Sequence, residues 1–146
     1  KMANLGMERG VFVAHTIYWS EPSLTSGKTD KLDQFLTEIK ESVDVAKRVN
    51  ARWMTVVPGH VDLKKNIGYQ TANVVESLKR ASDILEPHDL VMVLEPLNYI
   101  SHPGLFLQKT SHAHLICKMV DSPSCKILND LFHQQIVAGS DNATIN

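Results

Sequence analysis

The sequence predicts an α/β fold with a parallel sheet. Segments with the length and composition of strands alternate with segments of helical periodicity, which favours right-handed crossovers between parallel strands. The residues from Leu90 to Leu94 are apolar without a break, as is typical of a strand that is covered on both faces. A polar or charged residue follows each of the four predicted strands. The pattern alone fits both a closed barrel and a doubly wound open sheet.

Proline and glycine set the ends of two of the predicted strands. Pro96 cannot donate a ladder hydrogen bond, so its strand should end near Glu95. Pro58 and Gly59 stop the preceding strand in the same way. The first strand is predicted to be buried. The predicted strands cover residues 10–15, 52–57, 90–95 and 125–130, and the groups at their carboxyl ends are His15, His60, Glu95 and Asp130.

Three segments between these strands have apolar residues at three- and four-residue steps, which predicts amphipathic helices. The first should begin at a cap formed by Thr29 or Asp30, and the third at a cap formed by Ser111. The second should begin at Tyr69. The predicted helices end near Val49, Leu85 and Val120, and residues 132–136 continue into a loop or a further helix.

Length and composition indicate one globular domain rather than a nucleic-acid or membrane protein. The hydrophobic fraction of 43% suffices for a core in a chain of 146 residues. The net charge of -1 disfavours nucleic acid as a partner, and no apolar run is long enough to cross a bilayer. Cys117 and Cys125 lack both metal-ligand spacing and a disulfide framework, so both are expected to be small core residues.

Glu95 and Asp130 stand at the ends of strands that should be neighbours, about 4.8 Å apart. Two carboxylates at that spacing repel each other unless a cation or a proton lies between them. Hard oxygen ligands favour Mg²⁺ or Mn²⁺, with Zn²⁺ as an alternative. His133 follows Asp130 by three residues and should point at the same pocket. His15 and His60 are further candidates, although each is also explained as a hydrogen-bonded or solvated ring.

Two motifs carry a resemblance to a known family. The stretch Leu94-Glu95-Pro96-Leu97-Asn98 and the stretch Asn129-Asp130-Leu131-Phe132-His133-Gln134-Gln135 resemble the hydroxypyruvate isomerase family, which belongs to the xylose isomerase-like TIM barrels. Residues 56–59 and 69–73 also resemble that family. Asn129 departs from the pattern, because relatives often carry a larger side chain there.

The resemblance implies that residues 1–146 are one partial TIM-barrel domain, containing strands three to six of a (β/α)8 barrel. It implies that Glu95 is both a metal ligand and the catalytic acid/base, and that Asp130 is a second metal ligand. It also implies that His133 contacts a substrate oxygen, and His60 is a second candidate for substrate binding. The family's remaining ligands and its second glutamate would lie outside this chain.

The expected activity is that of an isomerase, an intramolecular oxidoreductase that interconverts small hydroxycarbonyl compounds or sugars through a metal-stabilised enediolate. One alternative is a non-catalytic sugar-binding module, or an inactive fragment, of the same fold. Another is an endonuclease-like phosphodiesterase, which would need further zinc-binding histidines and a basic groove. Residues 1–146 alone are expected to be inactive, and to be either homo-oligomeric or poorly soluble, because the sheet edges would be unpaired. The sequence leaves the cellular location open, with the cytoplasm as the default.

Overall fold

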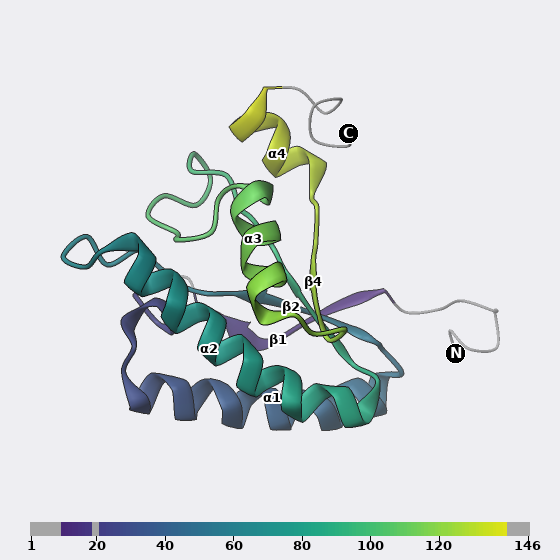
Figure 1. Ribbon diagram of the computed structural model, residues 1–146. Helices are drawn as coiled ribbons and strands as arrows, with labels where there is room; N and C mark the ends of the chain where they lie inside the picture. Colours follow the sequence, from purple (N-terminus) through teal and green to yellow (C-terminus); the bar gives the residue numbers. More distant parts are fainter. Residues whose placement is uncertain (1–9, 19–20, 140–146) are drawn as a thin grey trace.

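The computed structural model describes residues 10–18 and 21–139 and has strands and helices in regular alternation (Figure 1). Two single turns of 3-10 helix, η2 and η3, lie between the main elements. In chain order the elements are β1 (Val11–Ile17), η2 (Leu24–Ser26), α1 (Thr29–Val49), β2 (Trp53–Val57), α2 (Ile67–Leu85), η3 (Glu86–His88), β3 (Val91–Leu94), α3 (Thr110–Val120), β4 (Cys125–Ile127) and α4 (Leu131–Ala138).

The four strands form one parallel sheet whose spatial order, β1-β2-β3-β4, equals their order in the sequence. Helices α1, α2 and α3 pack against one another in sequence and contribute to one core on a single face of the sheet (Figure 1). A doubly wound sheet has helices on both of its faces, whereas a barrel has all of its helices outside. The arrangement is therefore that of part of a β/α barrel, which decides between the two architectures that the sequence pattern left open.

Alternate strand residues separate the two faces of the sheet. Met54 and Val56 of β2, with Met92 and Leu94 of β3, pack on the helices, and all four have fully buried side chains. Residues one position away point to the opposite face, because side chains alternate along a strand. Val93 lies on that opposite face, as does the position of Glu95 just beyond the end of β3. The sheet thus presents Glu95 on the side that is the interior of a barrel.

Two predicted strand boundaries are wrong. β1 continues to Ile17, so His15 lies within the strand rather than after it, and the strand is not buried, since Val13 is 68% exposed. Among the described strands, β1 pairs with β2 alone, so the other edge of β1 has no described strand beside it. β4 ends at Ile127 rather than Asp130, because Asp130 turns the chain into α4 as its N-cap.

The predictions for all three helix starts also need correction. Ser111 lies inside α3, and α1 begins at Thr29 without any side-chain cap. α2 begins two residues earlier than Tyr69, because the side chain of Asn66 accepts a hydrogen bond from the backbone of Gly68 (2.7 Å). Within the described ranges, none of the helices combines the length and apolar character needed to cross a bilayer.

Candidate functional site

Glu95 is placed by the buried strand that precedes it. Its backbone amide donates to the Val56 carbonyl (3.3 Å), so the residue remains in register with β2 after β3 has ended. Pro96 then prevents further pairing, and Leu97 is buried beneath the turn. The Glu95 side chain is half-buried. A short, fully apolar strand thus presents a single carboxylate at its carboxyl end.

Asp130 is held by helix capping. One of its carboxylate oxygens, Oδ1, accepts a hydrogen bond from the backbone amide of Phe132 (2.9 Å) at the start of α4. The second oxygen, Oδ2, lies 3.8 Å from Nε2 of His133. The cap therefore fixes the orientation of the carboxylate, with one oxygen on the helix and the other toward His133.

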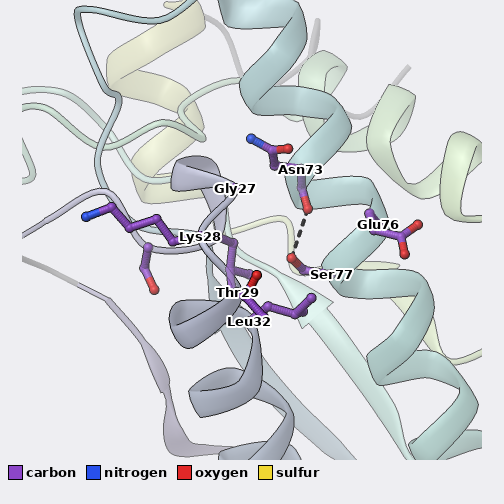
Figure 2. A pocket seen from close by; sticks show the side chains of 9 residues that line it. Gly27, Lys28, Thr29, Leu32, Asn73, Glu76 and Ser77 are labelled. Carbon is purple, nitrogen blue, oxygen red and sulfur yellow. Dashed lines mark hydrogen bonds between the residues drawn. The ribbon is translucent and has the colours of Figure 1, made fainter.

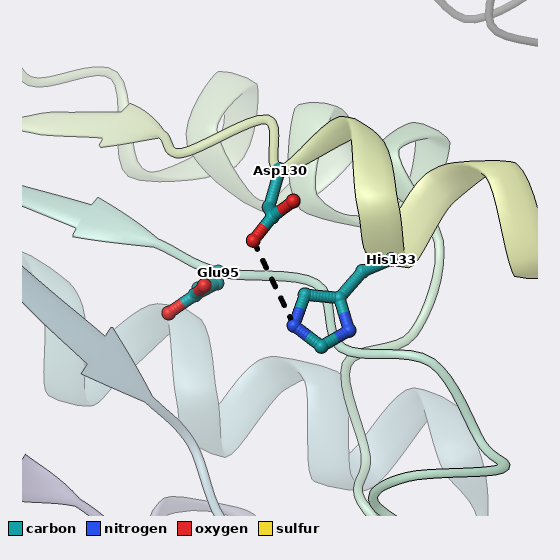
Figure 3. Close-up of side chains that lie close together, drawn as sticks. All are labelled: Glu95, Asp130 and His133. Atoms are coloured by element: carbon teal, nitrogen blue, oxygen red, sulfur yellow. Dashed lines mark ion pairs between the residues drawn. The ribbon is translucent and has the colours of Figure 1, made fainter.

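Glu95, Asp130 and His133 come together in space, as Figure 3 shows. Each offers a ligand atom, and these atoms lie within 4.8 Å of one another. The residues come from the end of β3 and from the first turn of α4. His133 is the most buried of the three, with 8% of its surface exposed. The predicted convergence of these side chains on one pocket agrees with this geometry.

Asn98 determines which nitrogen of His133 carries a proton. The side-chain oxygen of Asn98 accepts hydrogen bonds from the backbone amides of Ile100 (3.0 Å) and Ser101 (2.8 Å). This fixes the orientation of the amide and turns its NH₂ group toward Nδ1 of His133, 2.7 Å away. The backbone amide of Asn98 also donates to Nδ1 (3.3 Å). Since both neighbours are donors, Nδ1 must be the unprotonated, accepting nitrogen.

The other nitrogen, Nε2, therefore carries the proton of the neutral ring. Burial lowers the pKa of His133, and His102 lowers it further, while Asp130 opposes this shift, so the neutral ring is favoured. A protonated nitrogen has no lone pair for a metal ion. Although its ring lies beside the two carboxylates, His133 is arranged to donate a hydrogen bond from Nε2 rather than to act as a ligand.

The two carboxylates carry an electrostatic cost. The pKa of Glu95 is raised, first by burial and then by the nearby charge of Asp130. Both effects disfavour the ionised form of the carboxylate, whereas a bound cation would favour it. Mg²⁺ is commonly held by one or two carboxylates, with water and substrate oxygens completing its coordination. The described residues therefore fit a divalent cation held by Glu95 and Asp130.

Replacing Glu95 by glutamine should stabilise the metal-free protein at neutral pH. The folded state raises the pKa of Glu95, so its ionised form destabilises the fold above that pKa. The expected gain in unfolding free energy is on the order of 1 kcal/mol or less, because solvent screens the half-exposed carboxylate. The gain should shrink as the pH falls through the folded-state pKa and vanish below the ordinary range of a glutamic acid.

Urea denaturation in EDTA at several pH values would measure this difference. The test uses the native protein, that is, the full-length chain as it is produced in the cell. Glu41→Gln, on the exposed face of α1, is the matched control and should show no comparable gain. A Glu95→Gln variant less stable than the wild type at neutral pH would show that the carboxylate stabilises the fold.

The other candidate histidines lie elsewhere. His60 follows β2 and rests against the loop after β3, where a Cβ added to Gly104 would come within 3.0 Å of its Nδ1. It lines a cavity with His102 and Ser101 and is outside the group of converging ligand atoms. His15 lies in β1.

Two buried polar residues contribute to the site without having been singled out in the sequence. Asn98 is 0% exposed and orients His133, as described above. Gln134, 2% exposed, donates from Nε2 to the Pro96 carbonyl (3.2 Å) and accepts from the Thr110 amide (3.2 Å). Gln134 thereby ties α4 to the segment that follows Glu95. The available signal was the presence of both polar residues within the two motifs, but only the fold reveals their hydrogen-bond partners.

A separate cavity of about 100 Å³ lies between η2, the start of α1 and α2 (Figure 2). Two of its polar side chains already have partners, since the Ser77 hydroxyl donates to the Asn73 carbonyl (2.8 Å) and the Asn73 amide donates to the Thr25 carbonyl (3.2 Å). Among the described residues, the buried hydroxyl of Ser23, which also lines the cavity, has no hydrogen-bond partner. None of the converging side chains lines this cavity. It is best explained as a small packing gap rather than a substrate site.

The chain is similar in sequence to proteins named as hydroxypyruvate isomerases. A Xenopus laevis protein provisionally named as a hydroxypyruvate isomerase is 32% identical over 113 residues, covering 74% of this chain and 41% of that protein. Hydroxypyruvate isomerase of Escherichia coli (strain K12) is 34% identical over 71 residues, covering 47% and 26%. The chain thus spans less than half the length of these relatives.

Solved structures show the same fold. A family 2 AP endonuclease from Brucella melitensis superposes with a TM-score of 0.84 at 20% identity, covering 99% of this chain and 56% of that one. The IOLI protein, solved with a zinc atom, superposes with a TM-score of 0.72 at 20% identity, covering 86% and 42%. The model of the family described as "Xylose isomerase-like TIM barrel" matches residues 2–145. The chain belongs to the xylose isomerase-like TIM barrel family.

Proposed function

We propose that the protein is an isomerase that interconverts a small 2-oxo hydroxy acid, of the hydroxypyruvate type, with its aldehyde isomer. The observation that carries this proposal is the convergence of Glu95, Asp130 and His133 within 4.8 Å at the carboxyl ends of β3 and β4. Relatives named as hydroxypyruvate isomerases support the substrate class. Which four strands of the barrel are present stays a prediction.

Glu95 and Asp130 are proposed to hold a divalent cation, which supplies positive charge that stabilises an enediolate. Their hard oxygen donors favour Mg²⁺ or Mn²⁺. Zinc is the alternative, since the IOLI protein was solved with it. Two carboxylates form only part of a coordination sphere, so other protein ligands, water or substrate oxygens must supply the remainder.

Glu95 is proposed to move the proton. Its carboxylate accepts a proton from the carbon next to the substrate carbonyl and returns a proton to the neighbouring carbon. His133 contributes a hydrogen bond from Nε2 to a substrate oxygen. This bond stabilises negative charge as it develops on that oxygen during enolisation. His60, the second candidate for substrate binding, lines the cavity of the adjoining loop and lies apart from the three converging side chains, so its contact with the substrate stays a prediction.

Hydrogen exchange tests the activity directly. The native protein is incubated with hydroxypyruvate and Mg²⁺ in D₂O and followed by proton NMR. We expect deuterium to enter the hydroxymethyl carbon and the aldehyde isomer to form, and EDTA to stop both. Binding of the compound without exchange would identify a sugar-binding module. The absence of exchange across a panel of small 2-oxo hydroxy acids would contradict the proposal.

Asn98→Asp should change the tautomer of His133. Aspartate still accepts the hydrogen bonds from Ile100 and Ser101, but it presents an oxygen to Nδ1 instead of an NH₂ group. Nδ1 should then become protonated, and the turnover number should fall by roughly 10–100-fold, as for other groups that orient a site residue.

Nitrogen-15 NMR of histidine-labelled protein would show the protonation of each ring nitrogen, with His133→Gln identifying the signals. The matched control is Asn66→Asp, which keeps the cap of α2 and lies away from the site. A wild-type protein already protonated on Nδ1 would contradict the assignment, whatever the activity of the variant.

A further inference from the structure

Cys117 and Cys125 lie side by side at the opposite end of β4 from Asp130. Cys117 belongs to α3, and Cys125 is the first residue of β4. The chain turns between them at Asp121, whose φ of 53° is left-handed. The two Sγ atoms are 3.8 Å apart. A disulfide requires about 2.05 Å between sulfurs, so a small local shift would suffice to form one.

The two thiols differ in accessibility. Cys125 is 1% exposed, whereas Cys117 is half-buried. Both line a cavity that opens to solvent and that is also lined by His114, Lys118 and Lys126. A small solute can therefore reach the sulfur of Cys117, while Cys125 is reached chiefly through its neighbour. Cys125 belongs to the core, as expected, whereas Cys117 is only partly buried and packs against that core.

They also differ in acidity. The hydrogen bond between the two sulfurs lowers the pKa of Cys117, and the charge of Lys126 adds to this effect, while burial opposes it. For Cys125 the same hydrogen bond and burial both raise the pKa. Reactive cysteines are acidic and accessible, and redox-sensing ones have a second thiol nearby to resolve the first product. Cys117 and Cys125 match these two roles.

A metal site does not explain the pair. Structural zinc sites use four ligands from cysteine, histidine or carboxylate. Across the described residues, Glu95, Asp130 and His133 are the only such group whose ligand atoms converge. His114 lines the same cavity as the thiols but does not complete a ligand group with them. Two adjacent thiols without a third ligand are suited to redox chemistry instead.

We propose that Cys117 and Cys125 are an oxidation site at which a hydroperoxide converts the two thiols into a reversible disulfide. The Cys117 thiolate attacks the terminal oxygen of the hydroperoxide. The O–O bond breaks, an S–O bond forms, and the departing oxygen takes up a proton and leaves as an alcohol or as water. Cys117 is thereby oxidised to the sulfenic acid.

Cys125 then completes the reaction. Its sulfur attacks the sulfur of Cys117, the S–O bond breaks, and the leaving hydroxide combines with the Cys125 proton as water. In total, two thiols are oxidised and one hydroperoxide is reduced, with one alcohol (or water) and one further water as products. The disulfide would tie α3 to the start of β4 at the end of the sheet remote from Glu95, so this site does not rest on the proposed isomerase activity.

Peptide mapping of the native protein tests this site. The protein is treated with hydrogen peroxide, alkylated and digested with trypsin, which cleaves between the two cysteines at Lys118. We expect the peptides of residues 110–118 and 119–126 to be linked within one chain and to separate on reduction. If both thiols are still alkylated after peroxide, or if the links join different chains, the proposal is wrong.

Serine variants separate the two roles. In Cys125→Ser, Cys117 should stop at a sulfenic acid that dimedone traps. In Cys117→Ser, Cys125 should react with peroxide at least roughly tenfold more slowly than Cys117 does in the wild type. Equal rates at the two cysteines would contradict the assigned order. The mapping of the wild type decides the proposal even if a variant does not fold.

Discussion

Glu95→Gln in the native protein is expected to lower kcat by roughly 10³-fold, within the range for loss of a general acid/base. Glutamine keeps the size and shape of the side chain but cannot accept a proton from carbon. It also removes one of the charges proposed to hold the cation. The side chain stands beyond the end of β3 and is half-buried, so circular dichroism should show an unchanged fold.

The rate of deuterium exchange into hydroxypyruvate would measure this effect. It would be recorded at a Mg²⁺ concentration that saturates the wild type, and again at ten times that concentration. The matched control, Glu41→Gln, should exchange at the wild-type rate. Recovery of the rate at the higher Mg²⁺ concentration would assign Glu95 to metal binding alone. Turnover near that of the wild type at both concentrations would remove Glu95 from the catalytic site.

Asp130→Asn should weaken the binding of Mn²⁺ by at least about tenfold, the lower limit seen when even an outer-shell partner of a metal site is lost. Capping makes this variant informative. Asparagine is as good an N-cap as aspartate, and its oxygen must take the place of Oδ1 in accepting from the Phe132 amide. The NH₂ group then replaces Oδ2 and faces the site, where it cannot bind a cation. The helix should therefore be preserved while the ligand is lost.

Isothermal titration calorimetry with Mn²⁺ would measure the affinity. Asp121→Asn is the matched control, because it removes an exposed carboxylate from a left-handed position that asparagine tolerates. The control should bind Mn²⁺ as the wild type does. An unchanged affinity in Asp130→Asn would show that Asp130 is not a ligand.

The part of the fold that could be predicted from the sequence is the part set by local patterns. The uninterrupted apolar run that ends in Glu95 and Pro96 identified β3 and its carboxyl end within a residue. Helical periodicity likewise located α1 and α2, because burial on one face imposes its spacing on the residues themselves. The alternation of these elements gave the parallel sheet, but the barrel came from the family resemblance, and the position of the helices on one face supports it independently.

The errors arose where one residue type can serve two structural roles, or where burial depends on contacts between distant segments. Asp130 was read as the end of a strand, because a carboxylate after an apolar run looks the same whether it ends a strand or caps the next helix. The exposed side of β1 could not be foreseen from its composition, since Val13 is a typical strand residue and only its place at an edge of the sheet leaves it exposed.

The sequence predicted the chemical groups of the candidate site, but not the hydrogen bonds that orient them. Glu95, Asp130 and His133 could be proposed from residue type and motif, and the structure brings them together. The tautomer of His133 depends on Asn98, whose amide is fixed by two backbone donors in a tight turn. Local sequence patterns do not predict such a chain of hydrogen bonds, because it forms only once the turn at residues 98–101 and helix α4 have come together.

Anomalous diffraction from crystals of the native protein soaked in Mn²⁺ tests the central claim most directly. That claim is that the two carboxylates bind a divalent cation while His133 stays a hydrogen-bond donor. We predict one strong peak roughly 2.0–2.2 Å from an oxygen of Glu95 and from Oδ2 of Asp130, typical of a cation with hard oxygen ligands, with Nε2 of His133 outside the coordination sphere. A peak bonded to Nε2, or none between the two carboxylates, would contradict the account.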